Sequence, residues 1–223
     1  MSIKCAWISR ITTTINRRLN KNGQAYGLTV LAPIKKGHAD VLRHTLAKIP
    51  PVDVDSPLAN IPLTHNARFN VVDDLPFVGA PALQDHLQNQ YLLFSCAFDT
   101  GNTNYRSVEQ DLDAYLQQMF AAIPIEISAI WGHCAGFPEN PTLQSFQDFV
   151  RKYQISGGLF FADYPDNTAQ EVRRALFEQK KFIEFAIKAQ DIPDADPARL
   201  KAEFYAFNKA LGEMTTPPPG SIV

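Results

Sequence analysis

The order of apolar patterns between residues 25 and 138 limits the possible folds of this chain more than any other feature. Apolar side chains that alternate with polar ones, or that form short runs bounded by turn residues, predict strands. Apolar side chains spaced three and four residues apart predict helices. In chain order these patterns predict a strand at 25–34, a helix at 35–49, strands at 63–74 and 91–99, a helix at 107–123 and a strand at 125–138.

This β-α-β-β-α-β order predicts an α+β fold with an antiparallel ferredoxin-like sheet, helices on one face and the other face open. Beyond residue 138 the patterns predict a helix at 142–154, a strand at 155–165 and helices at 168–190 and 196–214. We therefore divide the chain into an N-terminal basic amphipathic helix (1–24), a ferredoxin-like domain (25–138), a helical appendage with one extra strand packed on the same domain (139–214), and an extended tail (215–223).

The N-terminal segment has an unusual charge pattern. The first 39 residues contain no aspartate or glutamate but seven lysines and arginines. Ile3, Trp7, Ile11 and Ile15 recur every fourth residue, so one helical face is apolar and the rest is basic or hydroxylic. Three interpretations remain open: a helix packed on the protein, a helix at a membrane surface, and a transit-type leader. We expect the packed helix, with peripheral membrane contact through residues 1–24 as the alternative.

Composition argues against several partners and compartments. The 223-residue chain has a formal net charge of −2 at pH 7, so no global field attracts nucleic acid. Its 3 cysteines lack the paired spacing of a zinc site and are too few to brace a small secreted domain, which predicts a reducing, cytoplasmic location. No apolar run reaches the roughly 18 residues that a transmembrane helix needs.

The candidate ligand site lies on the face of the predicted sheet that the helices leave open. Alternation along the strand at 63–74 separates its side chains into two sets. The set expected under the helices is His65, Ala67, Phe69 and Val71; the set expected on the open face is Asn66, Arg68 and Asn70, joined there by Thr29 and Ser95. Sparse polar groups on an apolar surface are typical of a ligand pocket, in which Arg68 would orient a polar group. The alternative is a solvated face, or a homodimer interface with Arg68 in an ion pair.

The stretch IWGHCAGFP at residues 130–138 sets His133 beside Cys134. On a strand these side chains point in opposite directions, so they do not converge on one metal or form a nucleophile couple. We expect Cys134 as a buried thiol. His133 is either a satisfied histidine at a strand end or, like His65, a candidate base or axial ligand. No GxGxxG, Walker, GxSxG, HExxH or CxxC motif occurs, which weighs against many common enzyme classes.

Several stretches carry a family resemblance, namely LTVLAPIKKGH (28–38), THNARF (64–69), LLFSCAFD (92–99), HCAGFP (133–138) and, more faintly, FFADYPDNTAQEVRR (160–174). With the predicted strand order, they resemble uncharacterised bacterial ferredoxin-like proteins of the dimeric α+β barrel superfamily. Relatives of that group include dye-decolourising peroxidases, chlorite dismutases and cofactor-free monooxygenases. The resemblance implies a homodimer of facing sheets and a cavity that admits an apolar molecule or a haem. The chain departs from the haem peroxidases, because it has no GxxDG block and no histidine that we can match to the proximal ligand.

Two functions therefore compete. The first is a small-ligand-binding α+β barrel, as an oxidoreductase of peroxidase-like or monooxygenase-like type, acting on an apolar molecule that carries a polar group. Its catalytic candidates are His133, Arg68 and His65, and its ligand-binding candidates are Asn66, Asn70, Thr29 and Ser95. The second is a non-catalytic homodimeric interaction module that associates with a partner protein or with an anionic membrane surface. Neither the substrate nor the cofactor follows from the sequence.

Overall fold

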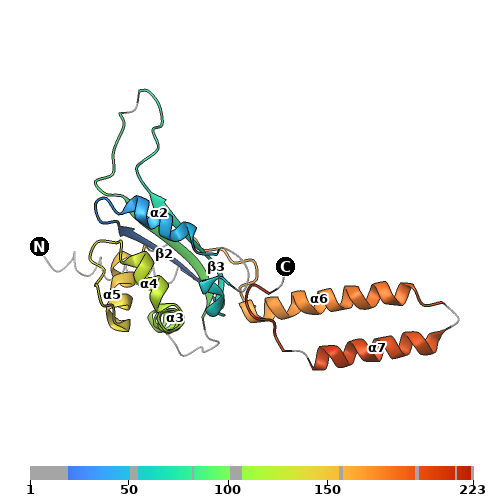
Figure 1. The fold of residues 1–223 in the computed structure, drawn as a ribbon. Coiled ribbons are helices and arrows are strands. Elements are labelled where there is room, and N and C mark those ends of the chain that lie inside the picture. Colours follow the sequence, from blue (N-terminus) through green and yellow to red (C-terminus); the bar gives the residue numbers. More distant parts are fainter. Residues whose placement is uncertain are drawn as a thin grey trace, which may run out of the picture.

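The computed structural model describes residues 20–50, 55–81, 83–100, 107–155, 158–193, 196–213 and 215–221. A body made of one sheet and its covering helices carries two projections, a long loop between two strands and a helical hairpin near the C-terminus (Figure 1). Most of the predicted N-terminal helix, residues 1–19, lies outside the described residues. Among the helices that are described, none combines the length and the apolar character that crossing a membrane requires.

One antiparallel sheet has the strand order β1-β2-β4-β3. Its members are β1 (Lys21–Asn22), β2 (Ala25–Pro33), β3 (Thr64–Val72) and β4 (Tyr91–Asp99). The three long strands lie where the sequence predicts them. β4 is flanked by β2 and β3, which agrees with its nearly unbroken apolar run. The prediction of an α+β fold with an antiparallel sheet is therefore confirmed.

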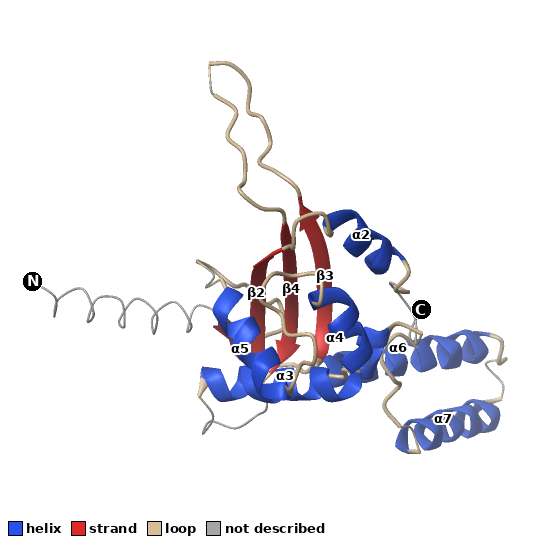
Figure 2. Cartoon of the chain, turned by 60° about the vertical axis from the view of Figure 1, so that its left-hand side comes forward, coloured by secondary structure: helices blue, strands red, loops and turns tan. Residues whose placement is uncertain are grey.

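Helices cover one face of this sheet (Figure 2). They are α2 (Ala39–Ala47), α3 (Val108–Ala122), α4 (Pro124–Trp131) and α5 (Leu143–Tyr153), with a short 3-10 helix, η1 (Pro57–Asn60), before β3. Even-numbered side chains of β2 and β4 face the helices, and Leu28, Val30, Phe94 and Phe98 among them are buried in the core. Most odd-numbered side chains of the same strands are partly exposed on the opposite face.

The predicted fourth strand at residues 125–138 is wrong, because its first half belongs to α4 and its second half is irregular. Pro124 lies in the first turn of α4, where its missing N–H needs no partner. Ile127, Ile130 and Trp131 are buried at helical spacing, whereas Ile125 is 77% exposed. The edge of the sheet beside β2 is taken instead by the short strand β1.

The predicted strand at residues 155–165 is also wrong. Residues 158–165 contain no helix or strand, although Gln154 just before them makes an isolated β-bridge to Val30. This irregular segment runs over the face of the sheet that the helices leave uncovered, where Phe160 contacts Gly27. We call residues 158–166 the strap.

The helical hairpin consists of α6 (Ala169–Gln190) and α7 (Pro197–Gly212) and extends away from the body (Figure 1). α6 begins at a capping box between Thr168 and Glu171. The two helices meet through aromatic rings, and the ring centroids of Phe185 and Phe207 lie 5.2 Å apart. Part of the predicted C-terminal appendage, α5, thus packs in the core of the body, whereas α6 and α7 leave it.

Candidate functional site

Polar side chains form a row across the open face of the sheet. Thr29 of β2 pairs with Ser95 of β4, and Arg68 of β3 pairs with the same Ser95, so the three residues stand side by side. The next row toward the end of β4 consists of Gly27, Ala97 and Asn66. The register therefore agrees with the sequence prediction that these polar side chains share one face.

A hollow of about 470 Å³ lies between this face and the strap. The backbone N–H of Gln24 donates to the carbonyl of Pro165 at 2.6 Å, and its side-chain amide donates to the carbonyl of Asp166 at 2.9 Å. These bonds fix one end of the strap to the chain just before β2. The side chains that line the hollow include Thr29, His65, Asn66 and Ser95 on the sheet and Leu159, Phe160, Phe161 and Tyr164 on the strap.

Phe160 and Gly27 are in contact at the floor of the hollow. A Cβ atom on Gly27 would lie 2.6 Å from the Phe160 ring, so a larger residue displaces the ring. Leu159, Phe161 and Tyr164 are exposed around the mouth of the hollow. The combination of an apolar rim and a polar floor suits a molecule with an apolar body and one polar group.

Gly27→Val is expected to lift the strap from the sheet, because the new side chain occupies the position of the Phe160 ring. We expect backbone amides of residues 158–166 to exchange with solvent at least about tenfold faster, since local opening costs less free energy. Hydrogen exchange followed by mass spectrometry measures this change. Gly158→Val is the matched control, because a Cβ atom there meets nothing within 4 Å. Equal exchange rates in the two variants would show that Phe160 does not anchor the strap.

His65 reaches the hollow because β3 is irregular at its start. Thr64 pairs with Phe98 and Asn66 pairs with Ala97, so His65 is an extra residue at a β-bulge. Thr64 turns toward the helices, where its hydroxyl lies 2.9 Å from the hydroxyl of Tyr115. The prediction that His65 lies under the helices with Ala67 is wrong for this reason.

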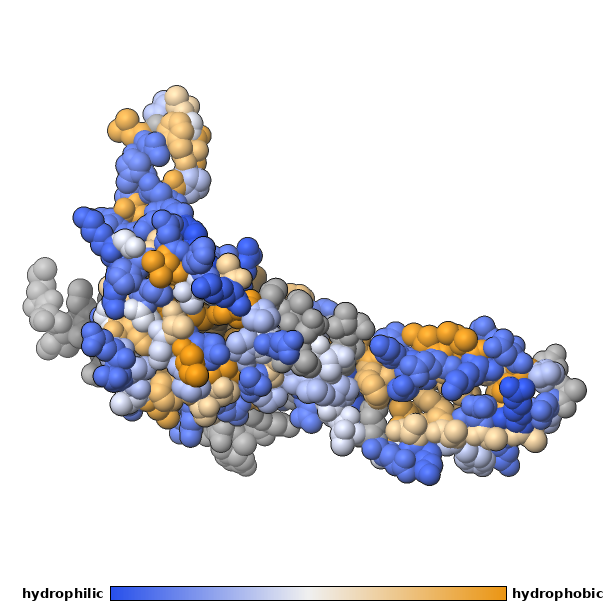
Figure 3. Space-filling model, viewed as in Figure 1, coloured by the Kyte–Doolittle hydropathy of each residue, from blue (hydrophilic) through white to orange (hydrophobic). Residues whose placement is uncertain are grey.

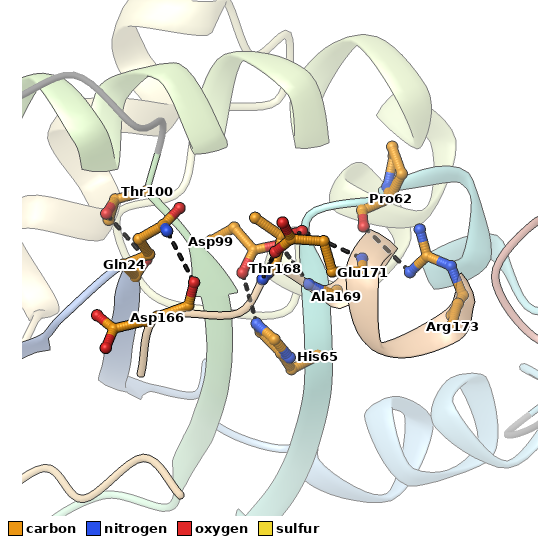
Figure 4. A network of polar contacts seen from close by, with 10 residues as sticks. All are labelled: Gln24, Pro62, His65, Asp99, Thr100, Asp166, Thr168, Ala169, Glu171 and Arg173. Atoms are coloured by element: carbon orange, nitrogen blue, oxygen red, sulfur yellow. Dashed lines mark hydrogen bonds and ion pairs between the residues drawn. The ribbon is translucent and has the colours of Figure 1, made fainter. Parts of the chain in front are cut away.

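A buried carboxylate holds the His65 ring (Figure 4). Nε2 of His65 lies 2.6 Å from Oδ1 of Asp99, and the two side chains are 24% and 3% exposed. Oδ2 of Asp99 accepts a hydrogen bond of 2.8 Å from the backbone N–H of Ala169, the first residue of α6. The N-terminus of a helix carries a partial positive charge, so the Asp99 side chain lies at the end of α6 where an acidic residue is favourable. Asp99, the last residue of β4, therefore contacts both His65 at the wall of the hollow and the first residue of the hairpin.

Arg173 adds a positive charge near this carboxylate. Its Nη1 donates to the carbonyl of Pro62 at 3.3 Å, while its buried Nε has no hydrogen-bond partner among the described residues (Figure 4). Burial lowers the pKa of Arg173, and the negative charge of Asp99 acts in the opposite direction. Arg173 contributes to a second depression beside the hollow, of about 450 Å³, whose wall also includes His65.

The pairing with Asp99 decides which nitrogen of His65 carries the proton. An ionised carboxylate is an acceptor only, so the Nε2 that faces it holds a hydrogen and donates. In the neutral ring the lone pair is then on Nδ1. Nδ1 has no hydrogen-bond partner in the described part of the chain. A neutral histidine that is oriented by a buried aspartate in this way can accept a proton on its other ring nitrogen.

The other candidate residues lie outside the hollow. Arg68 and Asn70 are on the open face of β3 but do not line it. His133 lies beyond the other end of β2, where its carbonyl accepts from the N–H of Lys35 and its Nδ1 is 3.0 Å from Nδ1 of His38. Burial, His38 and Lys35 together lower the pKa of His133. The hollow thus brings together His65, Asn66, Thr29 and Ser95 from the predicted set.

The thiol of Cys134, the residue after His133, is unreactive. Cys134 is fully buried and its backbone forms an isolated bridge to Ile34. Burial raises the pKa of its thiol to about 12, so almost none is present as the reactive thiolate at neutral pH. The expectation of a buried thiol is confirmed, and no catalytic couple forms at residues 133 and 134.

Sequence reasoning missed Asp99 and the whole strap. Asp99 ends an apolar strand, and a carboxylate that follows directly on a buried run is a signal that could have identified it. The strap carries no such signal, because its apolar residues also fit the pattern of a strand. Asn20 also lines the hollow, but the sequence around it predicts an amphipathic helix and carries no signal of a ligand site.

Comparison of the chain with family models, curated protein sequences and solved structures gives no match in any of the three.

The walls of the hollow do not fit a haem. A haem needs an axial ligand and usually cations beside its propionates. The described lining contains no lysine or arginine, and Nε2 of its one histidine is already paired with Asp99. Among the described residues there is also no cluster of three or more side chains that could hold a metal ion.

Proposed function

We propose that the protein binds a small molecule with an apolar body in the hollow beneath the strap and uses His65 to remove a proton from it. The observation that carries this proposal is the contact of 2.6 Å between His65 and the buried Asp99. The strap supplies apolar contacts, and Thr29, Asn66 and Ser95 offer hydrogen bonds to a polar group of the ligand. This proposal develops the hypothesis of a small-ligand-binding protein that the sequence suggested. It adds Asp99 to the site, and it gives Arg68 and His133 no role in the reaction.

Each group has one role in the proposed reaction. Nδ1 of His65 accepts the proton, and the ring becomes an imidazolium. The carboxylate of Asp99 holds the ring and stabilises its positive charge. The polar side chains of the floor stabilise the negative charge that the substrate gains. The strap limits the access of water, which strengthens all of these interactions.

A carbon acid with a simple optical signal tests the proposal. In nitrobenzisoxazole a base removes the proton on the ring carbon, the C–H electron pair forms the nitrile, and the N–O bond breaks to give a coloured phenolate. We expect the protein to catalyse this elimination, and His65→Ala to lower kcat/KM by about a hundredfold, the usual contribution of a general base. Absorbance of the cyanonitrophenolate follows the reaction.

Two variants make this test specific. His65→Gln keeps a donor toward Asp99 but has no basic nitrogen, so it separates the loss of a base from a loss of structure. His44→Ala removes an exposed histidine of α2 and serves as the control that keeps full activity. A rate for the native protein no higher than that of buffer, or a His65→Gln rate equal to that of His44→Ala, rejects the general-base role.

A further inference from the structure

The α6 helix has apolar side chains on two opposite sides. On one side Phe182 and Phe185 contact α7 through Phe207. A second set, Leu176, Ile183 and Ile187, is exposed by 48%, 50% and 57%. At about 100° per residue these three side chains fall within roughly 40° of one another, on the side away from α7. We call this set the α6 stripe.

The α6 stripe is accessible in the hairpin as described. The hairpin extends away from the body, and apolar residues follow the edge of α6 that is remote from α7 (Figure 3). In α6 and α7 the one buried residue is Ala169, so the hairpin has little core of its own. A helix that is apolar on two sides is typical of an element packed between two neighbours.

We propose that the α6 stripe packs antiparallel against the α6 stripe of a second copy of this chain. The charges beside the stripe favour this occupant. Lys180 and Glu184 are both exposed and lie on the same border of the stripe, within about 80° of its centre. A two-fold axis between Lys181 and Phe182 places Leu176 opposite Ile187 of the second copy. The same axis brings Lys180 next to Glu184 of the second copy, so the two surfaces are complementary in charge.

A parallel arrangement lacks this contact. Its two-fold axis runs along the helices, so the Lys180 and Glu184 side chains of the two copies would lie on opposite borders of the contact and would not meet. In the antiparallel pair the two bodies lie at opposite ends of α6, which is about 33 Å long for its 22 residues. The bodies are therefore separated, and the hollow of each copy is independent of the contact. The proposal does not rest on the chemistry of His65.

The mass of the full chain in solution tests this interface. Sedimentation equilibrium is expected to give about twice the chain mass of 24.9 kDa. Ile183→Glu places a charge at the centre of the stripe and is expected to reduce the mass to that of one chain. Val41→Glu is the matched control, because Val41 is 54% exposed on α2, far from the stripe, and this variant keeps the dimer mass.

A charge exchange tests the antiparallel register. Lys180→Glu alone and Glu184→Lys alone are each expected to weaken association at least about tenfold, and the double variant is expected to restore it. Circular dichroism confirms that each variant keeps its helices.

Three results would overturn the proposal. They are a native chain that is monomeric at all concentrations, an Ile183→Glu chain that stays dimeric, and a double variant that associates no better than the single ones. Two further measurements apply if the native chain is monomeric. If Ile183→Glu then lowers the stability of the chain, the stripe is covered by another part of the same chain. If the native chain floats with vesicles of anionic phospholipid and Ile183→Glu does not, the stripe binds lipid. Either result rejects the second copy as the occupant.

Discussion

Asp99→Leu is expected to lower the free energy of unfolding by about 3 kcal/mol, because two donors lose their acceptor in a buried position. The donors are Nε2 of His65 and the backbone N–H of Ala169, at 2.6 Å and 2.8 Å. Leucine fills a similar volume but accepts neither bond, and the N-terminus of α6 loses the negative charge that faces it. Urea unfolding, followed by tryptophan fluorescence, measures the loss.

Two further substitutions separate the parts of this effect. Asp99→Asn keeps one acceptor oxygen, so its cost is expected to be about half as large, while His65 loses the charge that orients its ring. Asp85→Leu changes an exposed aspartate in the loop before β4 and is expected to alter stability by less than about 0.5 kcal/mol. A loss at Asp99 no larger than that at Asp85 would mean that the buried carboxylate does not tie α6 to the sheet.

The strands could be predicted because their side chains alternate between two different surroundings. In β2 and β4 every second residue is buried under helices, and this period of two is visible in the sequence. The same alternation predicts that the side chains of Thr29, Ser95 and Arg68 share one face of the sheet. The bulge at His65 could not be predicted. Its neighbours Thr64 and Asn66 are both polar, so one extra residue there does not disturb any alternation of apolar and polar residues.

The strap and α4 show where pattern reasoning fails for a physical reason. In the strap, Phe160 and Phe161 resemble strand residues, but Phe160 packs on the surface of a sheet whose backbone groups are already paired. Nothing in the segment itself tells which surface an apolar residue will cover. Near α4, the apolar residues Ile123, Ile125, Ile127 and Trp131 alternate, yet Ile127, Ile130 and Trp131 also fit the spacing of a helix. Both periods match, and contacts with the rest of the core decide between them.

Trp131→Ala is expected to cost about 3–5 kcal/mol, because it empties the centre of an aromatic cluster. The Trp131 side chain is 1% exposed, and its ring lies edge-on to the rings of Phe94 and Phe149 at 5.5 Å and 5.8 Å between centroids. Ile125→Ala on the same helix is the control, since Ile125 is 77% exposed and its loss is expected to cost less than about 0.5 kcal/mol.

The pair of substitutions also distinguishes the helix from the strand that the alternation suggested. On a strand, residues 125 and 131 share one face, so both changes would destabilise the protein or both would be tolerated. On α4 the two side chains point about 120° apart around the helix axis, so that of Trp131 is in the core and that of Ile125 is in solvent. A large loss at Trp131 together with none at Ile125, measured by urea unfolding, is the result that the helix requires. Equal losses at the two positions would contradict it.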